Sequence, residues 1–315
     1  MLQRTECPLK KTTLPIFPES KILSIGSCFA EEIGKKLKAH LLDCSINPAG
    51  IAFNPLSLED LWNFQWNERD IFQHREIWHS LKHHSILSAA NREALLNNIE
   101  QSHREMDAYK TTADLVIVSF GTAYCYHYRQ TNRRVANCHK IPQSEFEKKR
   151  VDVDEIVNLW SSILTRAKKE NPERHFIFTV SPVRHLKDGM IQNNRSKAIL
   201  QLAVEELIKF ERVHYFPAYE LMLDDLRDYR YYKDDMIHPT EKAVDYIWER
   251  FTDCFFSEKM ISYLKDISKL IKMLKHRPRF SFGIENQNHF EQMDQMKKRL
   301  CVKYPQKAQA IIGLS

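Results

Sequence analysis

The stretch Ile22-Leu23-Ser24-Ile25-Gly26-Ser27-Cys28-Phe29-Ala30 decides the fold of this chain. Its first four residues form a short apolar run that ends at Gly26, which is typical of a buried strand. Between residues 30 and 41 apolar side chains recur every four positions, which predicts an amphipathic helix. A side chain at this turn would lie at the carboxyl edge of a sheet and over the positive end of a helix. Open α/β sheets bind their ligands at this edge.

The turn carries two candidate nucleophiles, Cys28 and Ser27. We favour Cys28, because a helix N-terminus is expected to lower the pKa of a thiol and so to supply the thiolate. Ser27 is the alternative nucleophile. A third interpretation has no covalent chemistry and treats Cys28 as a small buried apolar residue, as many unpaired cysteines are.

A candidate base lies more than 200 residues further on, in Asp235-Met236-Ile237-His238-Pro239-Thr240, before an apolar helical pattern. The Asp235 carboxylate is placed to orient the His238 imidazole, which would then deprotonate a nucleophile held elsewhere. Asp234 is an alternative orienting acid. The same residues also suit ordinary capping of the helix that follows, and the two roles are compatible.

These motifs resemble the GSCFA family, which is grouped with the SGNH/GDSL hydrolase-like folds. Residues 26–30 spell the motif that names the family, and the resemblance covers most of the chain. It includes Asn47–Pro55, Phe120–Ala123, Ala136–Lys140, Ser181–His185, Asp188–Lys197 and Asp225–Pro239. The resemblance implies a three-layer, flavodoxin-like α/β fold with a parallel sheet between helices. It also implies action on ester- or thioester-linked acyl groups, O-acyl groups on carbohydrate among them, by hydrolysis or acyl transfer. No cofactor is expected.

The resemblance further implies donors for an oxyanion. Against the Gly-Asp-Ser pattern of the related hydrolases, Gly26-Ser27-Cys28 places Cys28 in the attacking position. Gly50 fits the glycine that supplies an N–H from the second sequence block. In the third block, Gly121-Thr122-Ala123 stands where Gly-x-Asn is expected, so the asparagine is missing beside Gly121. Asn54 and Asn137 are candidate replacements.

Further polar residues are candidates for binding substrate. Arg184, His185 and Lys197 follow a predicted strand that ends at Ser181, at the same edge as the nucleophile, and would hold a phosphate or carboxylate. The plain alternative is surface ion pairing. His84 is expected to line the cleft. It follows His79 and His83, but no cysteine or carboxylate completes a metal-binding set, so no metal site is expected.

Composition restricts the class of protein. The seven cysteines among 315 residues are odd in number and scattered, which favours reduced thiols and a cytoplasmic location. No apolar run is long enough to span a bilayer. The net charge is +6, but residues 257–315 hold twelve Lys/Arg and five Asp/Glu, so the remainder is close to neutral. No basic motif interleaved with aromatic residues favours a nucleic-acid partner.

The alternating pattern predicts one α/β domain over residues 1–256. Strands are expected at 22–25, 114–120, 176–180 and 213–216, with short extended pieces around 44–54, and helices are expected at 30–41, 152–169, 194–210 and 241–255. Residues 56–113 read as an insertion rich in Trp and His. Residues 257–315 read as a basic helical extension, with a first helix ending near His276-Arg277-Pro278 and a second over about 288–303.

Two other functions remain open from the sequence. One is a catalytically inactive module of the same fold that binds a glycan or a nucleotide. The other is an assembly protein that works through the basic extension, for instance as a homo-oligomer formed by its helices.

Overall fold

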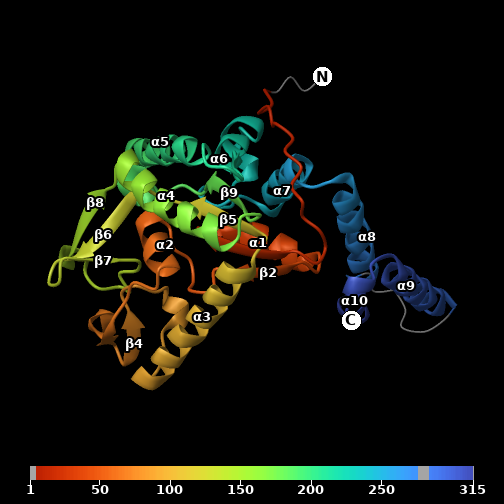
Figure 1. Ribbon diagram of the computed structural model, residues 1–315, viewed down its shortest axis with the longest axis horizontal. Helices are drawn as coiled ribbons and strands as arrows, with labels where there is room; N and C mark the ends of the chain where they lie inside the picture. Colours follow the sequence, from red (N-terminus) through yellow and green to blue (C-terminus); the bar gives the residue numbers. More distant parts are fainter. Residues whose placement is uncertain (1–4, 276–283, 315) are drawn as a thin grey trace.

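The computed structural model describes residues 5–275 and 284–314, with side chains from residue 288 onward in the second segment. Five parallel strands form the central sheet: β1 (Lys21–Gly26), β2 (Asp43–Ile46), β5 (Leu115–Phe120), β9 (His175–Val180) and β10 (Val213–Phe216). Their order across the sheet is β2-β1-β5-β9-β10 (Figure 1). The strand order is that of the flavodoxin-like fold, and the predicted α/β class is confirmed.

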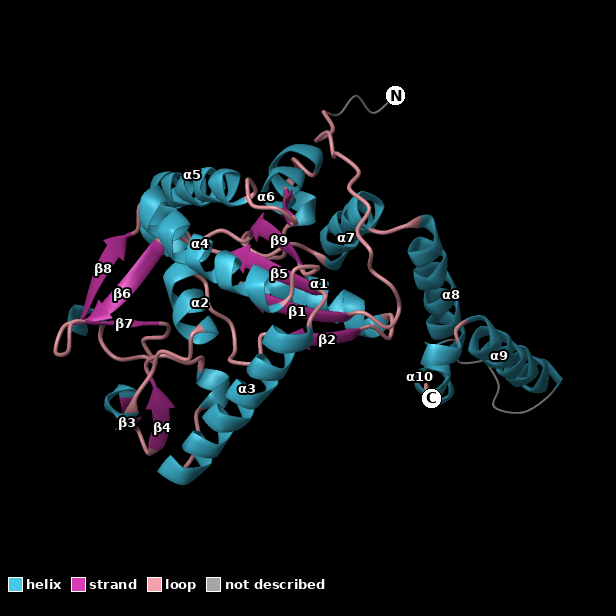
Figure 2. Cartoon of the chain, viewed as in Figure 1, coloured by secondary structure: helices cyan, strands magenta, loops and turns pink. Residues whose placement is uncertain are grey.

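Helices cover both faces of the sheet (Figure 2). On one face, α1 (Cys28–Ala39) and α7 (Glu241–Phe255) pack on strand residues such as Ile22, Ile117 and Ile177. The other face, which includes Leu23 and Val116, is covered by four helices: α2 (Pro55–Trp62), α3 (Arg92–Thr112), α4 (Val153–Glu170) and α5 (Gly189–Leu207). Because successive side chains of a strand point to opposite faces, strands buried on both sides are apolar throughout.

Several elements were not expected from the sequence. They are the hairpin β3 (Ile71–His74) and β4 (Ile77–Ser80), the antiparallel sheet of β6 (Tyr124–Tyr128), β7 (Arg133–Val135) and β8 (Phe146–Arg150), and the short α6 (Ala218–Glu220). These strands are short and partly polar, so they lack the apolar run that identified the central strands. The segment 56–113, which the sequence suggested as an insertion, supplies most of α2 and all of α3, and both helices cover the sheet.

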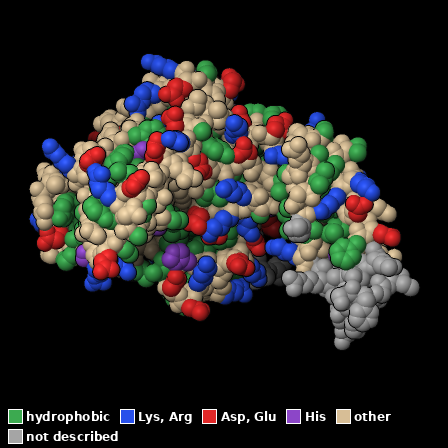
Figure 3. Space-filling model, turned by 90° about the horizontal axis from the view of Figure 1, so that it is seen from below, with side chains coloured by type: hydrophobic (Ala, Val, Ile, Leu, Met, Phe, Trp, Pro, Cys, Tyr) green, Lys and Arg blue, Asp and Glu red, His purple; other side chains and the backbone are tan. Residues whose placement is uncertain are grey.

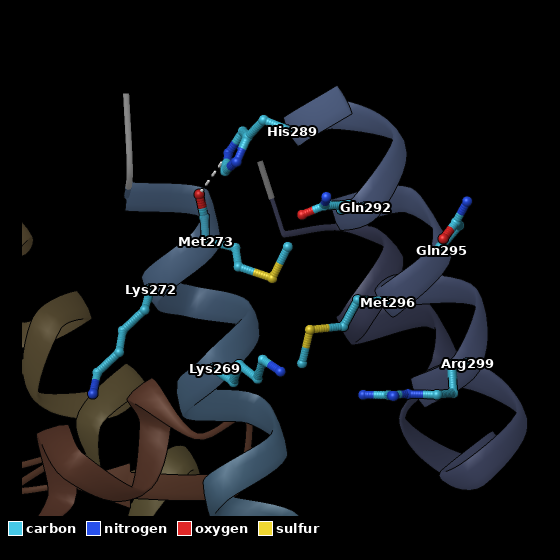
Figure 4. A pocket seen from close by; sticks show the side chains of 8 residues that line it. All are labelled: Lys269, Lys272, Met273, His289, Gln292, Gln295, Met296 and Arg299. Atoms are coloured by element: carbon cyan, nitrogen blue, oxygen red, sulfur yellow. Dashed lines mark hydrogen bonds between the residues drawn. The ribbon is translucent and has the colours of Figure 1, made fainter. Parts of the chain in front are cut away.

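The C-terminal helices α8 (Glu258–Lys275), α9 (Ile284–Lys303) and α10 (Ala308–Ile312) extend to one side of the sheet (Figure 1). They share the buried cluster of α1 and α7, and Tyr263 Oη donates to the His40 carbonyl at 2.9 Å. Figure 4 shows Met273 of α8 and Met296 of α9 pointing toward one another across a groove. The predicted helix end at 276–278 lies outside the described residues. The boundary between a domain and an extension stays a prediction.

On the face shown in Figure 3, Lys and Arg side chains are interspersed with Asp and Glu. Among residues 5–275 and 284–314, no helix has the length and apolar content needed to cross a bilayer.

Gly26 gives a test of how closely β1 and β5 approach. A Cβ at Gly26 would lie 2.1 Å from the Ser119 carbonyl oxygen, and the φ of +127° is unfavourable for any other residue. We expect Gly26→Ala to lower the free energy of unfolding by more than about 3 kcal/mol in urea denaturation.

Gly189→Ala is the matched control, since its φ is +77° but a Cβ there would meet nothing within 4 Å. Gly189 adopts φ +77° and ψ 159°, so Gly189→Ala should cost only the backbone strain, about 1–3 kcal/mol. Equal losses for the two variants would show that the contact with Ser119 has no effect.

Candidate active site

The carboxyl ends of β1 and β5 form the point where the chain changes direction across the sheet. β1 leads into α1 on one face, whereas the connection from β5 leads to α4 on the other face. Such a switch point opens a crevice at the carboxyl edge. Hydrogen bonds fix the turn there: Gly26 N–H donates to Asn47 Oδ1 at 2.8 Å, and Ser27 N–H donates to the Ser119 carbonyl at 3.0 Å.

The two candidate nucleophiles have different surroundings. Ser27 is 1% exposed, its Oγ accepts the Phe29 N–H at the start of α1, and the same Oγ lies 2.7 Å from Ser119 Oγ. Its hydroxyl therefore serves as the N-cap of α1. Cys28 is only half-buried and lines a cavity at the edge of the sheet.

The pKa of the Cys28 thiol is raised, whereas the sequence led us to expect a lowered value. Burial raises its pKa, and the negative charge of Glu31 in the first turn of α1 raises it further. The expectation of a lowered pKa considered only the helix end and not the loss of water around the sulfur or the nearby carboxylate. A thiol in this environment needs a base to become a nucleophile.

Asp235 and His238 form a hydrogen-bonded pair. Asp235 Oδ2 lies 2.7 Å from His238 Nδ1, while its Oδ1 accepts the backbone N–H groups of Ile237 and His238. These bonds lower the pKa of Asp235 to about 2, and the two backbone N–H groups contribute more than the imidazole does. The carboxylate therefore stays ionised at neutral pH. With Nδ1–H donated to the carboxylate, Nε2 of His238 carries the lone pair. No hydrogen bond to this Nε2 is present in the described part of the chain.

Cys28 and His238 line one cavity of about 40 Å³, although 209 residues separate them in the sequence. The fold brings them together because α1 and the loop before α7 lie on the same side of the sheet. The other lining residues are Phe29, Glu32, Val183, Lys233, Pro239 and Val244. Lys233 was not identified from the sequence, since one lysine in a polar loop gives no signal.

Three of the four residues expected to donate to an oxyanion already have acceptors. The N–H of Gly50 donates to the Asn47 carbonyl and that of Gly121 to the Phe53 carbonyl, both at 2.7 Å. Asn54 caps α2, and its Nδ2 donates to Ser57 Oγ at 2.9 Å.

The fourth expected donor, Asn137, accepts the His139 N–H through its side-chain oxygen at 2.9 Å. By contrast, Cys28 is the first residue of α1, so its own N–H has no acceptor within the helix.

His84 packs against Gly50. A Cβ at Gly50, whose φ is +80°, would lie 2.2 Å from the Cβ of His84, so only glycine allows this approach. Burial lowers the pKa of His84, and the negative charge of Glu31 opposes that shift. That His84 lines the cleft stays a prediction.

Lys197 lies in a different place from the expected substrate contact. It is 1% exposed, and its Nζ donates to the carbonyls of Gly121 and Ser181, each at 2.7 Å. Lys197 thus joins the ends of β5 and β9 and is not available to a substrate anion.

His185 and Arg184, which were predicted to bind substrate together with Lys197, lie at two different places. His185 lies beside Gly121 and edge-on to Phe53, and burial together with the Lys197 charge lowers its pKa to about 4. His185 is therefore a neutral side chain near the crevice. Arg184 faces a second cavity, which is described below.

Three histidines of the segment 56–113, namely His79, His83 and His103, lie within hydrogen-bonding distance of neighbouring side chains. His79 lies on β4, with its Nδ1 2.7 Å from Ser88 Oγ, and His83 Nε2 lies 3.1 Å from His103 Nε2. Within the described residues, no group of three or more His, Cys, Asp or Glu side chains is arranged to hold a metal ion.

A model of the GSCFA family matches residues 21–251. An acetyl xylan esterase (Est2A) from the rumen bacterium Butyrivibrio proteoclasticus superimposes with a TM-score of 0.43 at 12% identity, covering 80% of this chain and 67% of that one. A family two carbohydrate esterase from Clostridium thermocellum, in complex with cellohexaose, superimposes with a TM-score of 0.38 at 11% sequence identity. The match covers 79% of this chain and 66% of that one. The chain spans about two thirds of the length of each esterase. No curated protein matches the chain.

The buried Lys197 predicts how stability changes with pH. Burial, with Arg184 nearby, lowers the pKa of Lys197 from 10.5 to about 7. Between these values the unfolded chain binds a proton that the folded chain does not. The contribution of Lys197 to the free energy of unfolding must therefore rise with pH, by at most about 1.4 kcal/mol per pH unit.

Urea denaturation between about pH 7 and pH 9 tests this claim in the wild type, in Lys197→Met and in the exposed control Lys187→Met. We expect the wild type to gain stability relative to Lys197→Met as pH rises, with Lys187→Met following the wild type. If the difference in free energy of unfolding between the wild type and Lys197→Met stayed constant with pH, that result would contradict the burial of an uncharged Lys197.

Proposed function

The chain belongs to the GSCFA family, and we propose that it is an SGNH-like esterase or acyltransferase that uses Cys28 as its nucleophile. The observation that supports this proposal best is the cavity shared by Cys28 and His238, with Asp235 bound to the far nitrogen of the imidazole. In this arrangement the orienting acid Asp235 contacts the base His238, and the base shares a cavity with the nucleophile Cys28.

The first half of the proposed reaction forms an acyl-enzyme. Nε2 of His238 takes the proton of the Cys28 thiol, and the sulfur attacks the carbonyl carbon of an ester or thioester. The tetrahedral intermediate then collapses, and the leaving alcohol or thiol takes the proton from His238. Asp235 stabilises the imidazolium that exists between these two transfers, and its low pKa keeps it charged throughout.

The second half releases the acyl group. Water or an acceptor hydroxyl loses a proton to His238 and attacks the thioester at Cys28, and the returning proton restores the thiol. Water as the acceptor gives hydrolysis, and a sugar hydroxyl gives acyl transfer. We leave this choice open, since both use the same residues.

The oxyanion donors in this proposal differ from the family expectation. The Cys28 N–H, at the positive end of α1, is one donor, and the Lys233 ammonium, which lines the same cavity, is the second. A lysine from the loop before α7 would then replace the asparagine that is missing beside Gly121. Gly50 and Gly121 serve through their small size, because each lets a histidine approach the backbone.

The size of the cavity favours a small acyl group. At about 40 Å³ it has room for only a few water-sized groups between Cys28 and His238. An acetyl group, such as those carried by carbohydrate hydroxyls, meets this limit, whereas a long chain would need the loop to move.

Intact-mass analysis after brief exposure to p-nitrophenyl acetate tests the nucleophile. We expect one acetyl adduct on the wild type and none on Cys28→Ala. Loss of the base in His238→Ala should slow adduct formation by a factor of about 100 or more. Ser27→Ala should keep the adduct, while losing about 1 kcal/mol of stability with its N-cap.

Cys7→Ala is the matched control, because Cys7 is another half-buried cysteine whose pKa burial raises. It should acetylate as the wild type does. An adduct that survives Cys28→Ala, or one that disappears only with Ser27→Ala, would overturn the assignment of Cys28.

A catalytically inactive binding module is the second candidate function. The engaged N–H groups of Gly50 and Gly121 and the raised pKa of Cys28 favour it. It predicts no adduct on any variant, together with binding of a small acylated sugar that persists in Cys28→Ala.

A further inference from the structure

A second cavity lies behind the loop that carries the catalytic pair. Its volume is about 500 Å³, in the range of cavities that bind small organic molecules. Much of its wall is made of thioether and aliphatic side chains, namely Met190, Met222, Leu223 and Leu226. Met222 and Leu226 are almost fully buried, whereas Met190 at the mouth is 47% exposed.

The two cavities share their walls. Val183 lines the small cavity beside Cys28, and the next residue, Arg184, lines the large one. In the same way Lys233 faces the small cavity, while its neighbour Tyr232 faces the large one. An occupant of the large cavity therefore touches the chain segments that position His238.

Arg184 brings an uncompensated positive charge to this wall. Its Nε is buried without a hydrogen-bond partner, and its Nη1 contacts only the weak acceptor Sδ of Met190, at 3.7 Å. No ion pair within the described residues involves Arg184. Burial lowers the pKa of Lys197, and the positive charge of Arg184 lowers it further, so this lysine does not supply a fixed second charge at neutral pH.

The other charges on the wall are already balanced. Arg227 pairs with Asp224, and the Asp228 carboxylate accepts the backbone N–H of Arg230 and lies 3.6 Å from its guanidinium. The Arg184 guanidinium is thus the group that lacks an anion, and a carboxylate is the partner that fits its planar fork.

We propose that this cavity binds an amphiphilic carboxylate, with its apolar body on the exposed lining residues Leu186, Met190 and Met236 and its carboxylate on Arg184. The apolar walls gain from covering an alkyl chain or ring, and the acid supplies the charge that Arg184 lacks. The binding does not need the chemistry at Cys28, so the proposal stands apart from the esterase assignment.

Isothermal titration calorimetry at neutral pH tests this site with sodium octanoate as the probe and octanamide as its neutral analogue. We expect saturable binding of one octanoate per chain, about tenfold or more tighter than that of octanamide. Arg184→Gln should weaken octanoate binding by about the same factor and leave octanamide binding nearly unchanged.

Two further variants make the test independent of the fold of Arg184→Gln. Met190→Trp fills the cavity from a half-exposed position and should weaken both probes. Arg195→Gln removes the same charge from an exposed position of α5 outside the cavity, and it should bind as the wild type does.

Equal affinity for the two probes, full binding by Arg184→Gln or Met190→Trp, or the absence of saturable binding would overturn the proposal. Cys28→Ala should bind octanoate normally, so a failure of the acylation experiment would leave this result intact. Loss of octanoate binding in Cys28→Ala would also overturn it, because Cys28 does not line the large cavity.

Discussion

The close approach of β1 to β5 at Gly26 is the constraint on which the site depends. The space for a Cβ at Gly26 is taken by the Ser119 carbonyl, which also accepts the N–H of Ser27. The two serine hydroxyls meet at 2.7 Å, and Asn47 holds the Gly26 N–H from the loop after β2. Three strand ends are thereby locked together, and α1 begins at one defined residue, Cys28. A rigid support of this kind keeps a nucleophile in place.

His238, the proposed base, lies at the same edge of the sheet but on a different element, the loop before α7. The loop before α7 is fixed by a bridge between Tyr232 and Pro239 and by the Thr240 cap of the helix. Within it, one Asp235 oxygen orders the backbone and the other orients the imidazole of His238. Because α1 and α7 cover the same face of the sheet, residues from the two ends of the α/β region meet in one small cavity.

The sequence predicted the parts of this arrangement that follow from local pattern. The central strands are apolar runs, α7 has a clear helical period, and the turn at Ser27 and Cys28 and the pair Asp235 and His238 stand beside such elements. What it did not predict depends on long-range contacts. Nothing local shows that Lys197 joins two strand ends, that Ser27 is used as a cap, or that the N–H of Gly121 is taken by Phe53. The polar strands β6 to β8 were missed because their pairing, and not their composition, makes them strands.

The central claim is that His238 activates the thiol of Cys28 from across the edge of the sheet. The rate at which iodoacetamide alkylates Cys28 near pH 7, followed by peptide mass spectrometry, tests it without any assumption about the substrate. The account predicts that His238→Gln slows alkylation of Cys28 about tenfold or more, while alkylation of Cys7 in the same samples is unchanged. A rate at Cys28 that is the same in wild type and His238→Gln would contradict the account.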